Sequence, residues 1–157
     1  MKKINWKQLL LCIAIPLAVG GISALLTRNS MESFQNINQP PLSPPAWLFP
    51  VVWTILYTLM GIASYLVLSS GKNPIAIRAS LWVYALQLLV NFLWPIFFFN
   101  LEAYLFSFFW LLLLWALVAF TILLFSQLSK ASAWLLVPYL LWLTFAGYLN
   151  FAIYLLN

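Results

Sequence analysis

The sequence contains no histidine and no aspartate, and it has only two glutamates and one cysteine, Cys12, among 157 residues. Metal sites built on histidine or cysteine clusters are therefore excluded, and a lone cysteine cannot form an intramolecular disulfide. General acid–base catalysis by histidine or a carboxylate is unsupported. Proton-coupled transport is unsupported too, because it normally needs an ionisable group within the membrane. We therefore expect no metal and no required cofactor.

Charge is also scarce, since charged residues make up 6% of the chain, whereas hydrophobic residues make up 66%. The mean hydropathy is +1.03. A soluble domain of this length has too little interior to hide so much apolar surface. A membrane β-barrel would need short alternating segments, whereas the apolar runs here are continuous. The composition predicts an all-α integral membrane protein.

Five apolar runs are long enough to cross a bilayer, and we expect one bundle of five transmembrane helices spanning residues 1–157. The expected helices cover residues 8–27, 47–68, 79–99, 103–125 and 133–156. Residues 39–57 hold five of the nine prolines, which prevents helix before about Pro45. We expect residues 28–46 to form a loop that covers a ligand cavity.

The basic residues are distributed unequally between the two ends of the expected helices. One end has six of them, namely Lys2, Lys3, Lys7, Lys72, Arg78 and Lys130. The other end has Arg28 and both acids, Glu32 and Glu102. This asymmetry predicts a cytoplasmic N-terminus, an external C-terminus and an external loop at residues 28–46. Seven scattered basic residues are too few for nucleic-acid binding.

The third expected helix carries a polar and aromatic stripe. Its members recur at intervals of three, four and three residues, and they are Tyr84, Gln87, Asn91 and Trp94. An amide in hydrocarbon is costly unless it is hydrogen-bonded, so both amides should point inward. They could be the polar anchors of a cavity wall, or they could join helices by hydrogen bonds.

Aromatic stripes also occur on the second and fifth expected helices. The second has Trp53, Tyr57 and Gly61 at intervals of four. The fifth has Tyr139, Trp142, Ala146 and Asn150, with Phe145 beside them. Ordinary packing and anchoring at the membrane interface are the alternatives to a ligand site. Interfacial anchoring suits the tryptophans near the ends of expected helices, which are Trp6, Trp47 and Trp134.

Three separated motifs resemble the TspO/MBR family, which includes translocator proteins, tryptophan-rich sensory proteins and peripheral-type benzodiazepine receptors. The motifs are residues 44–47 with 52–61, the third-helix stripe with residues 94–98, and residues 138–146 with Leu149 and Asn150. Two positions depart from the family. Ser33-Phe34 stands where many relatives have Trp-Tyr, and the chain end lacks the basic residue of the animal cholesterol motif.

The resemblance implies a homodimer of five-helix chains in a bacterial cell membrane, with a ligand cavity below the first loop. Family members bind porphyrins such as protoporphyrin, and animal members bind cholesterol. Carried over by motif, the ligand-binding residues would be Ala46, Trp47, Trp53, Tyr57, Tyr84, Gln87, Asn91, Trp94, Trp142, Phe145 and Ala146.

The resulting hypothesis is a membrane protein that binds tetrapyrroles and other hydrophobic ligands in an aromatic cavity and regulates tetrapyrrole metabolism. Some bacterial relatives are linked to light-dependent porphyrin degradation. If this chain shares that activity, with porphyrin as substrate, Trp53 and Trp142 are the candidate photochemical residues. Two alternatives stay open. One is a transporter of porphyrins or sterol-like ligands, and the other is a ligand-sensing regulatory scaffold.

Overall fold

The computed structural model describes residues 4–157, so Lys2 and Lys3 lie outside the described residues, as does the side chain of Ser33. Long helices make up this part of the chain, without any strand: α1 (Trp6–Phe34), α2 (Leu48–Leu68), α3 (Pro74–Pro95), α4 (Tyr104–Leu128) and α5 (Lys130–Leu156). A π-helical turn, η1 (Ile96–Asn100), continues α3. All five helices are long and apolar enough to cross a membrane. The predicted all-α bundle of five transmembrane helices is confirmed.

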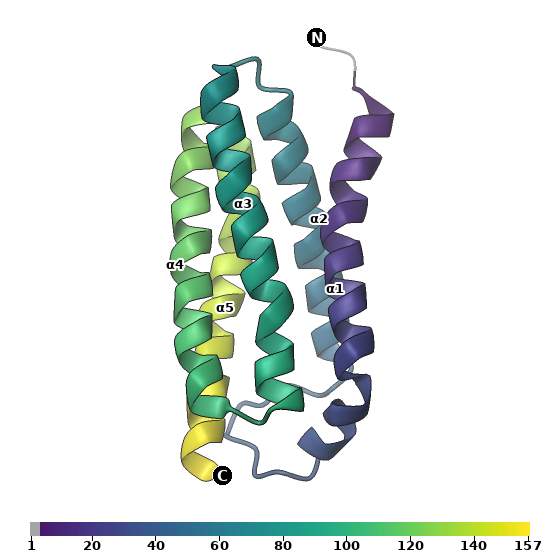
Figure 1. Ribbon diagram of the computed structural model, residues 1–157, viewed down its shortest axis with the longest axis vertical. Helices are drawn as coiled ribbons and strands as arrows, with labels where there is room; N and C mark the ends of the chain where they lie inside the picture. The colour runs from purple at the N-terminus through teal and green to yellow at the C-terminus, as the bar shows by residue number, and fades with distance from the viewer. Residues whose placement is uncertain (1–3) are drawn as a thin grey trace.

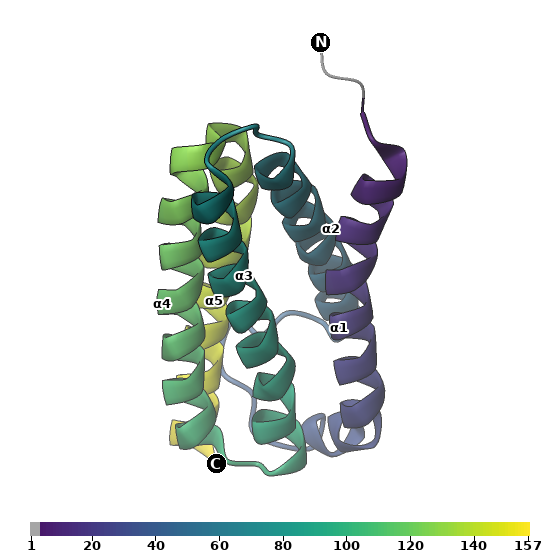
Figure 2. The same cartoon turned by 45° about the horizontal axis from the view of Figure 1, so that its top comes forward.

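The helices run alternately up and down and enclose a common core (Figure 1). Helix α2 packs between α1 and α5, and α4 packs between α3 and α5. Helix α1 also contacts α3 and η1, whereas α2 and α3 scarcely touch although they follow one another in the chain. Figure 2 shows α1 diverging from α2 and from the rest of the bundle toward the end where the N-terminus lies.

Two glycines let α1 and α2 come close together. A Cβ added at Gly61 would overlap the Cα of Ile13 and lie 2.7 Å from the carbonyl oxygen of Cys12. A Cβ added at Gly20 would overlap the ring of Tyr57. Gly21, by contrast, has no atom within 4 Å of its Cβ position. Close packing therefore requires glycine at Gly61 and Gly20, and at Gly61 the obstacle is backbone, which cannot rotate away.

The expected loop of residues 28–46 is wrong at its start, because α1 continues through Phe34. Residues 28–34 are mostly polar, but they contain neither proline nor glycine, so nothing in them stops the helix. Hydropathy indicated where the apolar part ends, not where the helix ends. The loop between α1 and α2 is therefore residues 35–47, which we call the α1–α2 loop.

Helix α3 begins at Pro74, five residues before the expected start at residue 79. The Asn73 side chain caps it by accepting a hydrogen bond of 2.9 Å from the backbone N–H of Ile75. Proline at the first helical position fits here, since that residue's N–H would have no helical partner. The connection between α4 and α5, expected over residues 126–132, consists of Ser129 alone. The Ser129 side chain caps α5 by accepting a hydrogen bond from the backbone N–H of Ser132.

Candidate functional site

Asn91 lies at the centre of a buried hydrogen-bond network that joins three helices. The Tyr57 hydroxyl on α2 donates to Asn91 Oδ1 at 2.7 Å. Asn91 Nδ2 on α3 donates to the Tyr139 hydroxyl of α5 at 2.6 Å. That hydroxyl in turn donates to Gln87 Oε1 at 2.9 Å. All four side chains are buried. We call this set the tyrosine–amide network.

The tyrosine–amide network confirms the prediction that both amides of α3 point inward, because Gln87 is 1% exposed and Asn91 is 3% exposed. Each hydroxyl donates once, and each of the three bonds joins two different helices. Interhelical hydrogen bonds of this kind contribute about 0.6 kcal/mol each on average within membranes. The network therefore holds α2, α3 and α5 in register, which agrees with the bundle-fastening interpretation of the stripe.

Aromatic rings of α2 and α5 lie next to this network. Trp53 stacks on Tyr57 with ring centroids 5.4 Å apart and meets Tyr139 edge-on at 6.1 Å. Trp142 meets Phe49 edge-on at 6.0 Å and Phe145 at 5.6 Å. These rings are only half-buried. We call Phe49, Trp53, Trp142 and Phe145 the aromatic wall.

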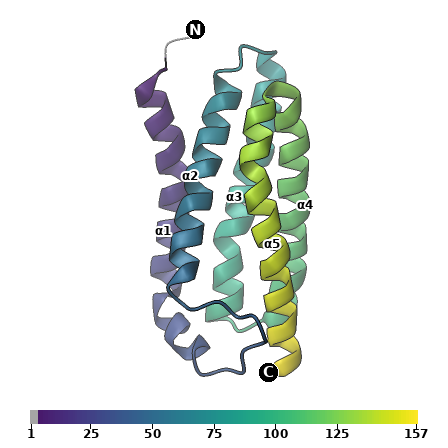
Figure 3. The same ribbon diagram turned by 180° about the vertical axis from the view of Figure 1, so that it is seen from behind.

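The α1–α2 loop is attached to the C-terminal turns of α5, as Figure 3 shows from behind. The Tyr148 hydroxyl donates to the carbonyl oxygen of Pro41 at 2.9 Å. The backbone N–H of Asn38 donates to Asn157 Oδ1, and Asn157 Nδ2 donates back to the Asn38 carbonyl, both at 3.0 Å. The Tyr148 ring also stacks on Phe145 at 6.3 Å. The loop is thereby connected to the aromatic wall.

Within the loop, residues 40–43 form a tight turn in which the backbone N–H of Ser43 donates to the Pro40 carbonyl at 3.3 Å. Leu42 adopts a left-handed φ of 69° in this turn. A leucine rarely takes that conformation, which is a sign of local strain. The strained turn lies directly beside Pro41, the residue that Tyr148 holds.

The other predicted ligand-binding residues belong neither to the tyrosine–amide network nor to the aromatic wall. Ala46 and Trp47 are exposed at the end of the α1–α2 loop, Trp47 by 66%. The Tyr84 ring packs on Phe125 of α4 at 5.8 Å. Its hydroxyl has no hydrogen-bond partner within residues 4–157, although Ser64 and Cys12 lie near it. Ala146 is buried in the core cluster.

Trp94 contacts α5 and η1 at a place separate from the aromatic wall. Its indole N–H donates to Asn150 Oδ1 at 3.2 Å, and its ring stacks on Phe98 of η1 at 5.1 Å. Asn150 Nδ2 donates to the Tyr104 carbonyl at 2.8 Å, which completes a second interhelical connection. Trp94 therefore joins α3 to α4 and α5 rather than to the aromatic wall.

Tyr139 and Tyr148 are important in the structure but were not among the predicted site residues. Tyr139 was visible as a member of the fifth-helix stripe, three residues before Trp142. The role of Tyr148 could not be found in the same way, because its partner lies 107 residues away in the α1–α2 loop.

Two open grooves are present on the described residues, and neither is lined by a predicted site residue. One, of about 720 Å³, lies between the end of α2 and the first half of α3. The other, of about 500 Å³, runs along α4 and α5 and includes Trp115, Gly147 and Tyr148. Beneath the α1–α2 loop, by contrast, the aromatic rings contact one another.

Comparison with known proteins identifies the family. The TspO/MBR family model matches residues 12–156. The tryptophan-rich protein TspO of Chlorobaculum tepidum is 39% identical, with 96% of this chain and 98% of the relative aligned. The tryptophan-rich sensory protein of Cereibacter sphaeroides is 36% identical over 98% of this chain and 93% of its own. The translocator protein of Bos taurus is 35% identical, with 87% of this chain and 82% of the relative aligned. The chain belongs to the TspO/MBR family.

Proposed function

We propose that this protein is a membrane receptor for tetrapyrroles, which it binds against the aromatic wall beneath the α1–α2 loop. One observation carries the proposal: aromatic rings of α2 and α5 contact one another, Phe49 with Trp142 and Trp53 with Tyr139, next to a buried polar network and a loop that is hydrogen-bonded to α5. A flat macrocycle stacks well on indole and phenyl faces, in the offset or edge-on geometries that aromatic rings prefer. Membership of a family with porphyrin-binding members supports the same ligand class.

The tyrosine–amide network has an indirect role in this proposal. Asn91 Oδ1, Asn91 Nδ2 and Gln87 Oε1 already bond to tyrosines, so these atoms do not need a ligand as partner. They fix the rings of Tyr57 and Tyr139, and Trp53 packs on both of those rings. The amides therefore orient the aromatic wall through the tyrosines, and the ligand is held chiefly by its apolar faces.

The α1–α2 loop acts as a lid in this account, because a ligand needs the wall's rings to separate and the loop above them to move. Tyr148→Phe removes the bond to Pro41 and keeps the ring that stacks on Phe145. We expect association and dissociation of protoporphyrin to become roughly fivefold faster, since a typical hydrogen bond contributes about 1 kcal/mol. Stopped-flow quenching of tryptophan fluorescence measures both rates.

The matched control is Tyr154→Phe, which changes an exposed tyrosine of the same helix. Unchanged rates in Tyr148→Phe would contradict the role of the loop as a lid.

The proposed receptor is tested first by equilibrium binding in lipid nanodiscs. We expect protoporphyrin to quench tryptophan fluorescence saturably, with one porphyrin bound per chain. Non-saturating quenching equal to that of empty nanodiscs plus free tryptophan would overturn the proposal. A homodimer, which we also expect, keeps this stoichiometry because each chain contains its own aromatic wall.

Light-dependent degradation is the second part of the proposal, with dioxygen as the oxidant and the Trp53 and Trp142 indoles beside the excited porphyrin. Under illumination, we expect porphyrin absorbance to fall faster with the protein than in detergent alone. Equal rates would remove the enzymatic part and leave binding intact. Protein-dependent movement of porphyrin into dark liposomes would instead favour the transport alternative.

The orientation of the bundle in the membrane is also a proposal. The described basic residues Lys7, Lys72, Arg78 and Lys130 lie at the end opposite to the α1–α2 loop, which favours a cytoplasmic N-terminus and an external loop and C-terminus. In a Cys12→Ser background, Asn36→Cys should react with an impermeant maleimide in intact bacterial cells. Lys72→Cys should react only after lysis, and the reverse pattern would contradict this orientation.

A further inference from the structure

The groove between α2 and α3, which we call the α2–α3 groove, exists because these two helices pack on different partners. Helix α2 packs on α1 and α5, while α3 packs on α4. Their connecting turn spreads them apart, with Gly71 in a left-handed conformation at φ 71°. The groove is lined by Leu68 of α2, by Gly71 and Lys72 of the turn, and by residues of α3 that include Ile77, Arg78 and Leu81.

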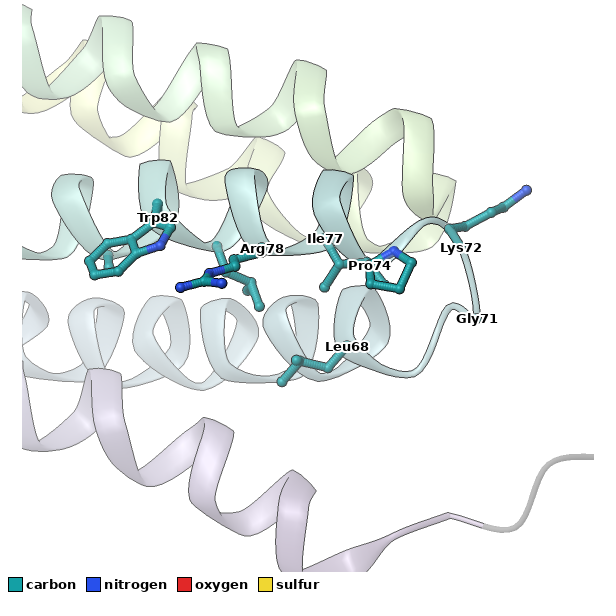
Figure 4. A pocket seen from close by; sticks show the side chains of 9 residues that line it. Leu68, Gly71, Lys72, Pro74, Ile77, Arg78 and Trp82 are labelled. Atoms are coloured by element: carbon teal, nitrogen blue, oxygen red, sulfur yellow. The ribbon is translucent and has the colours of Figure 1, made fainter.

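The chemistry of the α2–α3 groove changes along its length. Its apolar lining includes Leu68 of α2, with Ile77, Leu81 and Ala85 along α3. Its two cations are Lys72 in the turn and Arg78 of α3, which lies farther from the turn than Ile77. Figure 4 shows Arg78 lying over the groove opposite Leu68, while Lys72 extends outward from the turn. The groove is therefore amphipathic, with one cation at the turn and one among its apolar residues.

These two cations have no acidic partner in the described part of the chain. Both acids, Glu32 and Glu102, lie at the opposite end of the bundle, in the last turns of α1 and just before α4. No salt bridge joins Arg78 or Lys72 to another residue within residues 4–157, and both side chains are exposed. Trp82, 68% exposed one turn after Arg78, is placed like the indoles that anchor at the head-group level.

We propose that the α2–α3 groove binds an anionic phospholipid. Its phosphate meets the Arg78 guanidinium, with Lys72 adding long-range attraction, and its acyl chain runs away from the turn against Leu81 and Ala85. Basic pockets between transmembrane helices recognise anionic lipid head groups, and the planar guanidinium suits phosphate. This site is separate from the aromatic wall, so it does not depend on tetrapyrrole binding.

The test uses the full-length protein in mixed micelles that contain equal amounts of phosphatidylglycerol and phosphatidylcholine with identical acyl chains. Native mass spectrometry then measures the lipid that each variant retains. We expect preferential retention of phosphatidylglycerol. In Arg78→Gln this preference should fall about fivefold, since one basic residue near an anionic membrane surface changes binding by about that factor. Arg28→Gln, which removes an exposed arginine at the other end, should retain the wild-type preference.

Two further measurements examine the acyl chain. Ala85→Phe fills the apolar part of the groove without changing charge, and it should lower phosphatidylglycerol retention as well. Inorganic phosphate should not displace the lipid, since it cannot occupy the apolar part. Equal retention of the two lipids, equal losses in Arg78→Gln and Arg28→Gln, or displacement by phosphate or protoporphyrin would each overturn the proposal. Unchanged circular dichroism of the variants verifies that they fold.

Discussion

Gly61→Ala is expected to lower the stability of the bundle by about 1–3 kcal/mol, which is the usual cost of overpacking a close-packed interior. The added methyl group would overlap the backbone of Ile13 and lie 2.7 Å from the Cys12 carbonyl oxygen. Because neither atom belongs to a flexible side chain, α1 as a whole must move away from α2. Thermal unfolding of the protein in one detergent, followed by circular dichroism, measures the loss.

Gly21→Ala is the matched control for this prediction, since it makes the same change in a neighbouring helix where no atom lies within 4 Å. Its stability should stay within about 0.5 kcal/mol of the wild type. Equal midpoints for Gly61→Ala and Gly21→Ala would show that α1 and α2 do not approach as closely as described. A loss confined to Gly61→Ala supports the packing on which the position of Tyr57 depends.

The double variant Trp53→Phe, Trp142→Phe is expected to bind protoporphyrin about tenfold more weakly. Each substitution keeps an aromatic ring but reduces the stacking surface, and aromatic contacts contribute about 0.5–1.5 kcal/mol beyond the area that they bury. Two such losses reach about 1.4 kcal/mol, which is tenfold in affinity. The absorbance shift of bound porphyrin measures the affinity without relying on the remaining tryptophans.

The control for this variant is Trp6→Phe, Trp134→Phe, because these indoles are 64% and 73% exposed at the opposite end of the bundle. It removes the same number of tryptophans and should keep the wild-type affinity. If the two double variants bind equally well, the aromatic wall is not the binding site. Comparable helicity in both would exclude unfolding as the reason for any difference.

The five helices could be predicted because hydropathy alone marks where a chain can cross a bilayer. The inward direction of Gln87 and Asn91 could be predicted too, since an unpaired amide in hydrocarbon is costly. The end of α1 could not, because residues 28–34 are mostly polar yet remain helical. Polarity decides where a helix leaves the membrane, whereas proline, glycine and capping residues decide where it stops.

The composition of the site could be predicted only in part. Tyr84, Gln87, Asn91 and Trp94 share one stripe of α3, but α3 has several neighbours, so members of the stripe meet different helices. Tyr84 packs on α4, whereas Trp94 bonds to Asn150 of α5 and the amides bond to tyrosines of α2 and α5. Spacing along one helix identifies a face, but it does not identify what covers that face.

The most direct test of the proposed receptor is an experimentally determined structure of the protein with protoporphyrin bound in nanodiscs. We predict that the macrocycle lies between α2 and α5, in contact with Trp53 and Trp142 and covered by the α1–α2 loop. We also predict that the tyrosine–amide network stays intact beneath it. A macrocycle found in the α2–α3 groove, or on the outer face of α4, would contradict the account.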